Sequence, residues 1–388
     1  MQYRYVVLTL CTLAFIATMV ARLVISPVVP EITATFSVSK GAVGLALTGM
    51  WIAYAGTQFP SGVLADRFGE RRIILASVGL TAVASVLLAT APSYPVFAVM
   101  AVVLGAGTGL HYSVATSFLA RHFEHVGRAV GIHVTGGPIA GVLAPIAAAA
   151  VAVRYGFRPA LLLGAVVAVP VFVLFWLRVE PTEPAQPDKT MRSRFEIGPL
   201  RALLARREIQ YTTLMAVGGA FCWQATASFL PAFLIEYHGQ SAAKASALFS
   251  VYFVVLGVSQ PLLGSLSDRL GRDGIAAMTF GTGVVGYGSL VFGSGIVVLL
   301  VATSLVGVGM SWGAPVQSRF IDNLGSRERA AGFGLVRTVY MTLGALGSVV
   351  VGVLSDVAGW SVAFGLLAGV VAVGSLLAGV PAVINQYR

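Results

Sequence analysis

Charged residues are scarce in this sequence. Of its 388 residues, only 10% are Asp, Glu, Lys or Arg, whereas 57% are hydrophobic, and the mean hydropathy is +0.87. A soluble domain carries about 25% charged residues. The apolar residues recur in segments of roughly 20, which is the length that crosses a bilayer. The composition therefore predicts an integral membrane protein.

Cysteine is scarce as well. The two cysteines, Cys11 and Cys222, each lie inside a predicted span, far from any Cys or His at metal-ligand spacing. This spacing argues against a disulfide framework and a zinc site, and we expect neither a metal nor another cofactor. Both thiols are expected to pack as small hydrophobes. Because paired intramembrane acids and nucleophile motifs are also missing, we do not expect an enzyme.

Apolar runs bounded by Gly, Pro and charge clusters predict twelve membrane-spanning helices in two groups of six. The fold class is therefore an all-α membrane protein. A polar stretch separates the groups, so we expect a six-helix bundle at 1–178, a cytoplasmic linker at 179–208 and a second six-helix bundle at 209–388. The predicted spans are 5–27, 41–63, 73–91, 95–119, 129–153, 158–178, 211–236, 245–265, 275–293, 297–319, 330–354 and 361–384.

The net charge of +10 lies mainly in short loops on one side of the predicted helices. Cytoplasmic termini would place 19 Lys and Arg inside and four outside, which fits the excess of basic residues in cytoplasmic loops. The charges form no continuous basic face, so we expect lipid and a small-molecule substrate as partners, and no nucleic acid. Short loops and few lysines are typical of a prokaryotic cytoplasmic (inner) membrane.

A loop motif occurs twice, 202 residues apart. GVLADRFGERR at 62–72 and GSLSDRLGRDG at 264–274 share Gly, Leu, Asp, Arg and Gly at identical spacing, each at the cytoplasmic end of the second span of a half. The two halves are therefore predicted to be parallel copies. Repeats of this kind place a solute pathway at the midplane of the membrane.

With twelve spans, a central linker and G-x-L-x-D-R-x-G in both halves, the sequence resembles the major facilitator superfamily over nearly its whole length. The resemblance implies a transporter that works by alternating access, with the loop motif as a conformational latch. The two glycines of that motif in the first half, Gly62 and Gly69, are expected to allow close helix approach and a tight turn. The residues assigned to the latch are Gly62, Asp66, Arg67, Gly69, Arg71, Arg72, Asp268, Arg269 and Gly271, with Glu124 or Asp322 as acids that the arginines could pair.

Two arginines are predicted to lie inside spans, where insertion costs at least about 2.5–3.5 kcal/mol. Arg22 precedes Pro27–Pro30, which should break the first helix. It is similar to an arginine of the organic-anion branches of the superfamily, although Ala21 stands where those branches often carry Asp. We expect Arg22 to bind a carboxylate in bidentate fashion, the alternative being a bond to a helix carbonyl. Arg337 is the second candidate, near enough to the cytoplasmic end to snorkel.

Polar side chains within the other spans could line a solute cavity or join helices. No Asp or Glu lies deep in a span, so coupling to a proton would need another group. Histidine titrates in the relevant pH range, which makes His111 and His133 candidates for proton coupling, the alternative being neutral packed histidines. The further candidates for substrate binding are Tyr54, Gln58, His111, Tyr112, Trp223, Gln224, Trp312, Gln317 and Tyr340.

The leading interpretation is a secondary transporter for a small organic anion such as a monocarboxylate, driven by its own gradient or by a proton. One alternative is a drug or metabolite efflux antiporter, which the 10% aromatic content would suit. The stretch AVVLGAGTG lacks the arginine that drug/proton antiporters place there, which disfavours efflux. The other alternative is a transport-incompetent receptor that binds solute without flux. In each case we expect a monomer.

Overall fold

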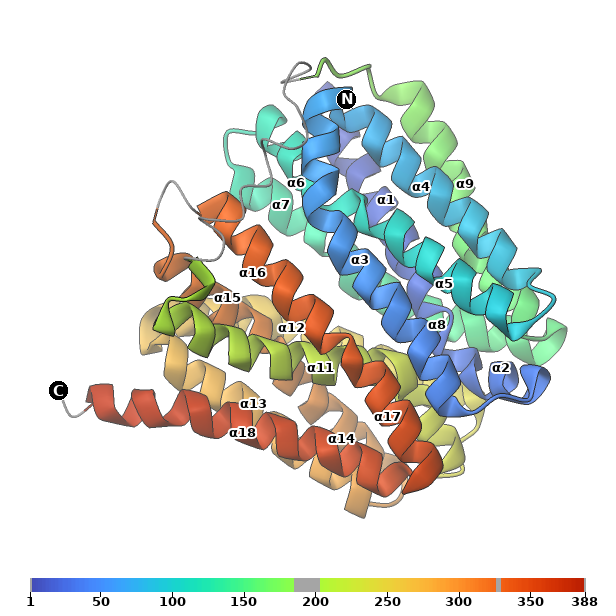
Figure 1. The fold of residues 1–388 in the computed structure, drawn as a ribbon, viewed down its shortest axis with the longest axis vertical. Helices are drawn as coiled ribbons and strands as arrows, with labels where there is room; N and C mark the ends of the chain where they lie inside the picture. The colour runs from blue at the N-terminus through green and yellow to red at the C-terminus, as the bar shows by residue number, and fades with distance from the viewer. Residues whose placement is uncertain (1, 185–202, 326–328, 387–388) are drawn as a thin grey trace. The chain divides into compact units, whose positions relative to one another are not determined.

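The computed structural model describes residues 2–184, 203–325 and 329–386, so the middle of the predicted linker lies outside the described residues. Within these ranges the regular elements are helices (Figure 1). The helices of the first half are α1 Tyr3–Leu23, η1 Ser26–Val28, α2 Val29–Phe36, α3 Lys40–Phe68, α4 Glu70–Ala89, α5 Tyr94–Gly109, α6 His111–His122, α7 Val126–Val134, α8 Gly136–Tyr155 and α9 Phe157–Arg178. Those of the second half are α11 Arg207–Glu236, α12 Ala242–Leu270, α13 Arg272–Phe292, α14 Ile296–Gly309, η3 Met310–Trp312, α15 Gly313–Asp322, α16 Arg329–Gly344, α17 Leu346–Val357 and α18 Trp360–Gln386.

Eleven helical runs in the described ranges are long and apolar enough to cross a membrane. We assign the twelfth span to α3, which is 29 residues long. Its apolar sequence is interrupted by Thr48, Trp51, Tyr54 and Gln58, which lower its hydropathy. The predicted all-α fold of an integral, multi-pass membrane protein is confirmed.

The first span breaks directly after Arg22. Helix α1 ends at Leu23, and Pro27 lies in the first turn of η1, where its missing N–H leaves no donor unsatisfied. The chain then continues as α2. The predicted break at Pro27–Pro30 is confirmed, and it places Arg22 in the last turn of a helix that ends within the first candidate span.

The contacts divide the chain into two units. Unit 1 contains 1–38 and 49–197, and unit 2 contains 39–48 and 198–388. The first residues of α3 therefore belong to unit 2, whereas the sequence placed all of 1–178 in one bundle. In unit 1, α1 packs against α8 and α9, and α4 packs against α5 and α9. In unit 2, α11 packs against α16, α17 and α18, and α13 packs against α14 and α18 (Figure 1).

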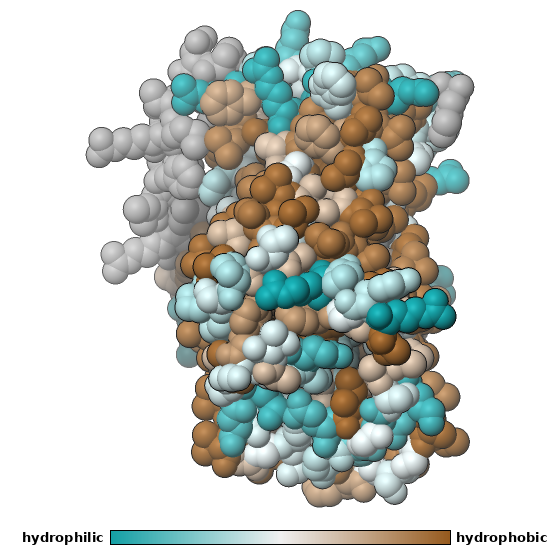
Figure 2. All heavy atoms as spheres, turned by 90° about the vertical axis from the view of Figure 1, so that its right-hand side faces the viewer, coloured by the Kyte–Doolittle hydropathy of each residue, from teal (hydrophilic) through white to brown (hydrophobic). Residues whose placement is uncertain are grey.

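The interior of each unit is apolar, and so is much of its surface. Cys11 and Cys222 are buried and free, as expected. Large apolar side chains also face outward, with Phe292 90% exposed, Val357 81% and Val153 74%. Figure 2 shows apolar side chains over much of the face turned to the viewer. Lipid tails accommodate such a surface, whereas water would disfavour it.

Candidate functional site

The Arg22 side chain is buried in unit 1 at 3% exposure. Its Nε donates to the Thr18 carbonyl oxygen at 3.2 Å, and its Nη2 donates to the Met19 sulfur at 2.9 Å. The guanidinium carbon lies 4.0 Å from the centre of the Tyr54 ring and 5.1 Å from that of Trp51, both on α3. Carbonyl, sulfur and ring contacts of this kind stabilise a cation.

Two fully buried histidines form a cluster with aromatic rings in the same unit. The rings of His111 on α6 and His133 on α7 lie 5.4 Å apart, centre to centre. Phe15 of α1 lies 6.1 Å from His111, 5.1 Å from His133 and 5.7 Å from Tyr112. The structure therefore brings together three residues that the sequence proposed separately, with Phe15 as their common neighbour.

One face of α1 joins these two groups. Phe15, Met19 and Arg22 are spaced by four and three residues, so they lie on the same side of the helix. Phe15 contacts the histidine cluster, and Arg22 contacts α3. The sequence interpretation missed Phe15, Met19 and Trp51, although their helical spacing from Arg22 and Tyr54 was a usable signal.

The remaining candidate of unit 1, Gln58, lies one turn after Tyr54 and is buried at 5% exposure. Its side-chain oxygen has no hydrogen-bond partner among the described residues. A buried amide oxygen without a partner is costly. The assignment of Gln58 as a substrate contact therefore stays a prediction. Its side-chain oxygen could accept a hydrogen bond from a ligand.

In unit 2, the candidates form an aromatic group next to η3. Trp312 lies 6.0 Å from Tyr340 and 6.3 Å from Phe280, ring centre to ring centre. Gly219 of α11 faces the indole so closely that an added Cβ would lie 2.3 Å from Trp312 Cε2. The indole N–H finds no acceptor among the described residues. The Trp312 indole thus packs directly against α11 at a position, Gly219, where any larger side chain would clash with it.

The other predicted residues of unit 2 are more dispersed. Gln224 donates from its amide nitrogen to the Met341 carbonyl oxygen at 3.0 Å, which joins α11 to α16. Gln317, Trp223 and Arg337 are half-buried. The contact of Gln224 is the interhelical type that the sequence left open as an alternative.

The loop motif of unit 1 makes a tight turn at Gly69, whose φ is +86°. An added Cβ there would meet the Thr182 carbonyl oxygen at 2.3 Å. Arg71 donates to the carbonyl oxygens of Trp176 at 2.6 Å and Val179 at 2.7 Å. The described partners of its guanidinium are thus carbonyl groups of α9 and of the residue after it, where the sequence suggested an acid.

The other latch candidates of unit 1 lie in varied surroundings. An added Cβ at Gly62 would meet no described atom within 4 Å, so the predicted close helix approach is not seen in unit 1. Glu124 is exposed and makes no ion pair with any residue that the structure describes. Asp66 is half-buried, and Arg67 and Arg72 are exposed.

An ion pair that the sequence interpretation missed lies beside this loop. Glu70 begins α4, and its side chain is 3% exposed. Its Oε1 lies 3.0 Å from Arg121 Nη1 on α6, whereas Arg121 is 45% exposed. The other carboxylate oxygen, Oε2, has no hydrogen-bond partner among the described residues. Arg121 is thus the described partner of a nearly buried charge.

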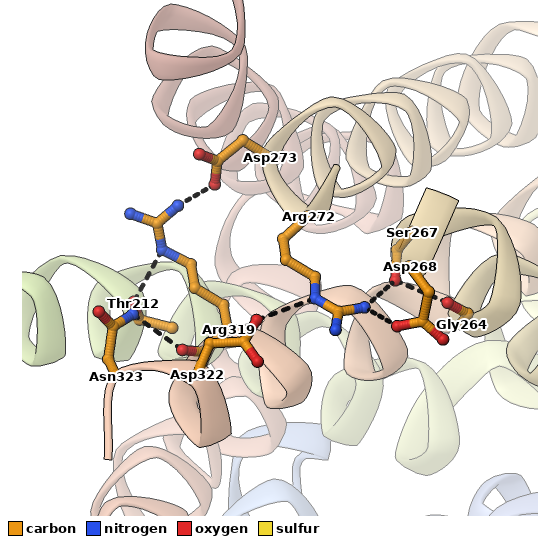
Figure 3. A network of polar contacts seen from close by, with 9 residues as sticks. All are labelled: Thr212, Gly264, Ser267, Asp268, Arg272, Asp273, Arg319, Asp322 and Asn323. Carbon is orange, nitrogen blue, oxygen red and sulfur yellow. Dashed lines mark hydrogen bonds and ion pairs between the residues drawn. The ribbon is translucent and has the colours of Figure 1, made fainter. Parts of the chain in front are cut away.

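The second copy of the motif belongs to a larger charge network (Figure 3). It also turns at a glycine, Gly271, with φ +95°. Arg272 donates from Nε to Asp322 Oδ2 at 3.1 Å and from Nη1 to Asp268. Asp322 was an expected acid, but its described partner is Arg272. Arg269 is exposed.

A second arginine extends this network. Arg319 of α15 donates to Thr212 Oγ1 at 3.1 Å, to Glu208 Oε2 at 3.0 Å and to Asp273. A cavity of about 1120 Å³ lies beside it, lined by three arginines and three acids. These charges balance and largely pair with one another, so the network is better suited to joining helices than to binding an anion.

A second group of charges in unit 2 surrounds the start of α3. Lys40 Nζ lies 3.3 Å from Glu236 Oε2 and 3.6 Å from Asp356 Oδ1. Asp356 also accepts from the backbone N–H groups of Lys40 at 3.2 Å and Gly41 at 2.7 Å, which caps α3. Trp360 donates from its indole nitrogen to Glu236 at 3.1 Å. We call these four side chains the Lys40 cluster.

Comparisons with known proteins agree with this architecture. A family model described as Major Facilitator Superfamily matches residues 10–242 and 214–383. The alpha-ketoglutarate permease of Escherichia coli is 26% identical over 231 residues, which cover 54% of this chain and 52% of the permease. The chain thus matches about half of that relative's length. The Multidrug resistance protein B homolog of Mycobacterium tuberculosis is 24% identical over 406 residues, covering 89% of this chain and 75% of that protein.

A solved structure shows the same fold. The bacterial homologue of the human lysosomal transporter Spinster, in an inward-facing and unoccupied conformation, has a TM-score of 0.80 at 17% identity, covering 98% of this chain and 96% of that chain. Among the described residues, no group of three or more His, Cys, Asp or Glu is placed to hold a metal ion. The family model matches most of the chain, and the chain belongs to the major facilitator superfamily.

Proposed function

We propose that this protein carries a small organic anion, such as a monocarboxylate, across the membrane, with Arg22 as the group that binds the anion. The observation that carries the proposal is the buried guanidinium against the Tyr54 and Trp51 rings. A charge in the membrane interior costs several kcal/mol and is usually retained for function. The planar guanidinium matches a carboxylate, which it can bind through two parallel hydrogen bonds.

The surroundings of Arg22 fit this role. Ring faces and a sulfur atom contact the guanidinium and hold it in place. The adjacent break between α1 and η1 interrupts the helix within the span, as is common where transporters bind solute. Alternating exposure of this site to the two sides of the membrane would carry the anion across. Alpha-ketoglutarate, the solute in the name of one relative, is itself a carboxylate.

Uptake by proteoliposomes tests the proposal. Radiolabelled lactate, pyruvate, benzoate and 2-oxoglutarate are offered to vesicles with the wild-type protein, and protein-free vesicles are subtracted. Arg22→Gln should lower uptake of an accepted carboxylate by about ten-fold or more, because a hydrogen bond to a charged group contributes roughly 1.5–3 kcal/mol. Arg22→Lys, which keeps the charge and loses the planar fork, should fall between.

Arg178→Gln is the matched control, because that arginine is exposed at the end of α9. It should transport at the wild-type rate. If Arg22→Gln carries every accepted carboxylate as fast as the wild type, the anion site is not at Arg22. If the wild type carries none of the carboxylates, the substrate class is wrong.

Efflux of a drug or metabolite is the second candidate. The match to the multidrug resistance protein homolog covers 89% of the chain, and the aromatic cluster around Phe15 would accept an apolar ring. Resistance profiles of an overexpressing strain separate the two candidates. Broad resistance to lipophilic compounds, unchanged by Arg22→Gln, would favour efflux.

We further propose a monomer in a prokaryotic cytoplasmic membrane, with both termini in the cytoplasm.

A further inference from the structure

The histidine cluster of unit 1 contains polar atoms that the fold itself does not satisfy. Neither ring nitrogen of His133 has a hydrogen-bond partner among the described residues, and its side chain is 0% exposed. His111 is equally buried, and its Nε2 lies 3.2 Å from the Cys11 carbonyl oxygen, whereas Nδ1 has no described partner. A neutral imidazole carries one donor and one acceptor. Leaving both unused in an apolar interior is costly, so the site calls for an explanation.

The charged and titratable groups around this pair are few. Helix α7 packs against α1, α6 and α8, and α6 also packs against α4 and α5, whose charged side chains, Glu70, Arg71 and Arg72, all lie in the first turn of α4. Helix α1 contributes Cys11 and Arg22, and Arg22 lies two helical turns, about 10 Å along the helix axis, after Phe15, whose ring contacts both histidine rings. Helix α6 contributes His111 and Tyr112. The part of α8 that follows, 136–149, carries no titratable side chain. On the face of α1 that carries Phe15 and Met19, the charged side chain is Arg22, the cation to which the proposed function assigns the anion.

We propose that His111 and His133 together form the proton site that couples anion transport to the proton gradient, an inference that rests on the proposed anion site at Arg22. A proton from water on the entry side binds a ring nitrogen of the pair and returns to water on the exit side. Two imidazolium rings 5.4 Å apart would repel each other, so the pair holds one proton at a time. No covalent bond to the solute is made or broken.

The sign of the coupling follows from the charges. An empty Arg22 repels a proton on the neighbouring imidazole pair, and a bound carboxylate removes that repulsion. Proton and anion therefore strengthen each other's binding by the same factor, which for coupled sites is typically about 5–150-fold. One proton with one monoanion moves no net charge, so the inferred cycle is an electroneutral symport.

The test uses full-length protein in liposomes that contain the pH dye pyranine, with lactate, pyruvate, benzoate and 2-oxoglutarate as probes. For an accepted monocarboxylate, the wild type should acidify the vesicle lumen at a rate equal to anion uptake. Uptake should rise as the external pH falls. His133→Phe keeps a ring against Phe15 and removes the proton site, so it should lose at least about ten-fold of proton-driven accumulation. It should still exchange labelled for unlabelled anion at equal pH.

His125→Asn is the matched histidine control, because His125 is exposed just before α7. It should keep proton movement and accumulation. His111→Gln provides a second variant if His133→Phe does not fold. If either folded variant keeps wild-type proton movement and pH dependence, the histidine pair is not the coupling site, although the anion site stands. If the wild type transports none of the four carboxylates, the anion site and the coupling site both fail.

Discussion

Removing Arg121 should destabilise unit 1 by leaving the buried Glu70 carboxylate without its described partner. Breaking a fully buried ion pair costs about 3–5 kcal/mol, whereas an exposed pair contributes about 1 kcal/mol or less. Here the acid is 3% exposed and the arginine 45%. Arg121→Ala should therefore cost an intermediate amount, about 2 kcal/mol. At roughly 2–4 °C per kcal/mol for a unit of this size, the melting midpoint should fall by about 4–8 °C.

The second half suggests how to rescue this loss. Glu70 begins α4 after Gly69, and Arg272 begins α13 after Gly271, 202 residues later. Arg272 pairs with Asp322 at the end of α15, so the polarity of the pair is reversed between the halves. A variant with Glu70→Arg and Arg121→Glu should therefore regain part of the lost stability. The recovery is partial because an acid in the first turn of a helix is favoured by the helix dipole.

Thermal unfolding of the purified protein in detergent measures these effects. Arg121→Glu alone should unfold at a lower temperature than Arg121→Ala, because it places two carboxylates together. Arg178→Ala removes an exposed arginine and should match the wild type. The reasoning is refuted if Arg121→Ala melts with the wild type, or if the double variant melts no higher than Arg121→Glu.

Three further changes follow from single contacts. Gly219→Ala would push a methyl group into the Trp312 indole and should cost about 1–3 kcal/mol in thermal unfolding; Gly218→Ala, which meets one methyl group at 3.3 Å, should cost less. Asp356→Asn weakens both the ion pair with Lys40 and the cap of α3. The protein should lose about 1 kcal/mol of stability, and its unfolding midpoint should become less sensitive to salt. Tyr54→Phe keeps the ring face under the guanidinium and should transport at a rate similar to the wild type, whereas Tyr54→Ala should be slower.

The spans and the break in the first helix could be predicted because their signals are local. Hydropathy over about 20 residues marks a span, and the Pro27–Pro30 segment marks the end of α1. The turn at Gly69 was also predictable, because the motif places a glycine where the chain must adopt a positive φ. Each of these features depends on residues that are close in the sequence and hardly on the packing of one helix against another.

The side-chain partners could not be predicted in the same way. Helical spacing puts Phe15 on the face of Arg22 and Trp51 on the face of Tyr54. It does not say that these faces meet Arg22 and His133, because that depends on how α1 lies against α3 and α7. The loop motif suggested acid partners for its arginines, yet the described partners of Arg71 are carbonyl groups. A backbone carbonyl carries no sequence signature, so this kind of partner is invisible before the fold is known.

The Lys40 cluster gives the protein a built-in optical probe. The ammonium group lies 5.6 Å from the centre of the Trp360 ring, and the indole N–H of that residue donates to Glu236. Indole emission depends on the electric field across the ring, so separating lysine from tryptophan would change its colour and intensity. The chain has five tryptophans. In a variant that retains only Trp360, fluorescence could follow the start of α3 during transport without any attached dye.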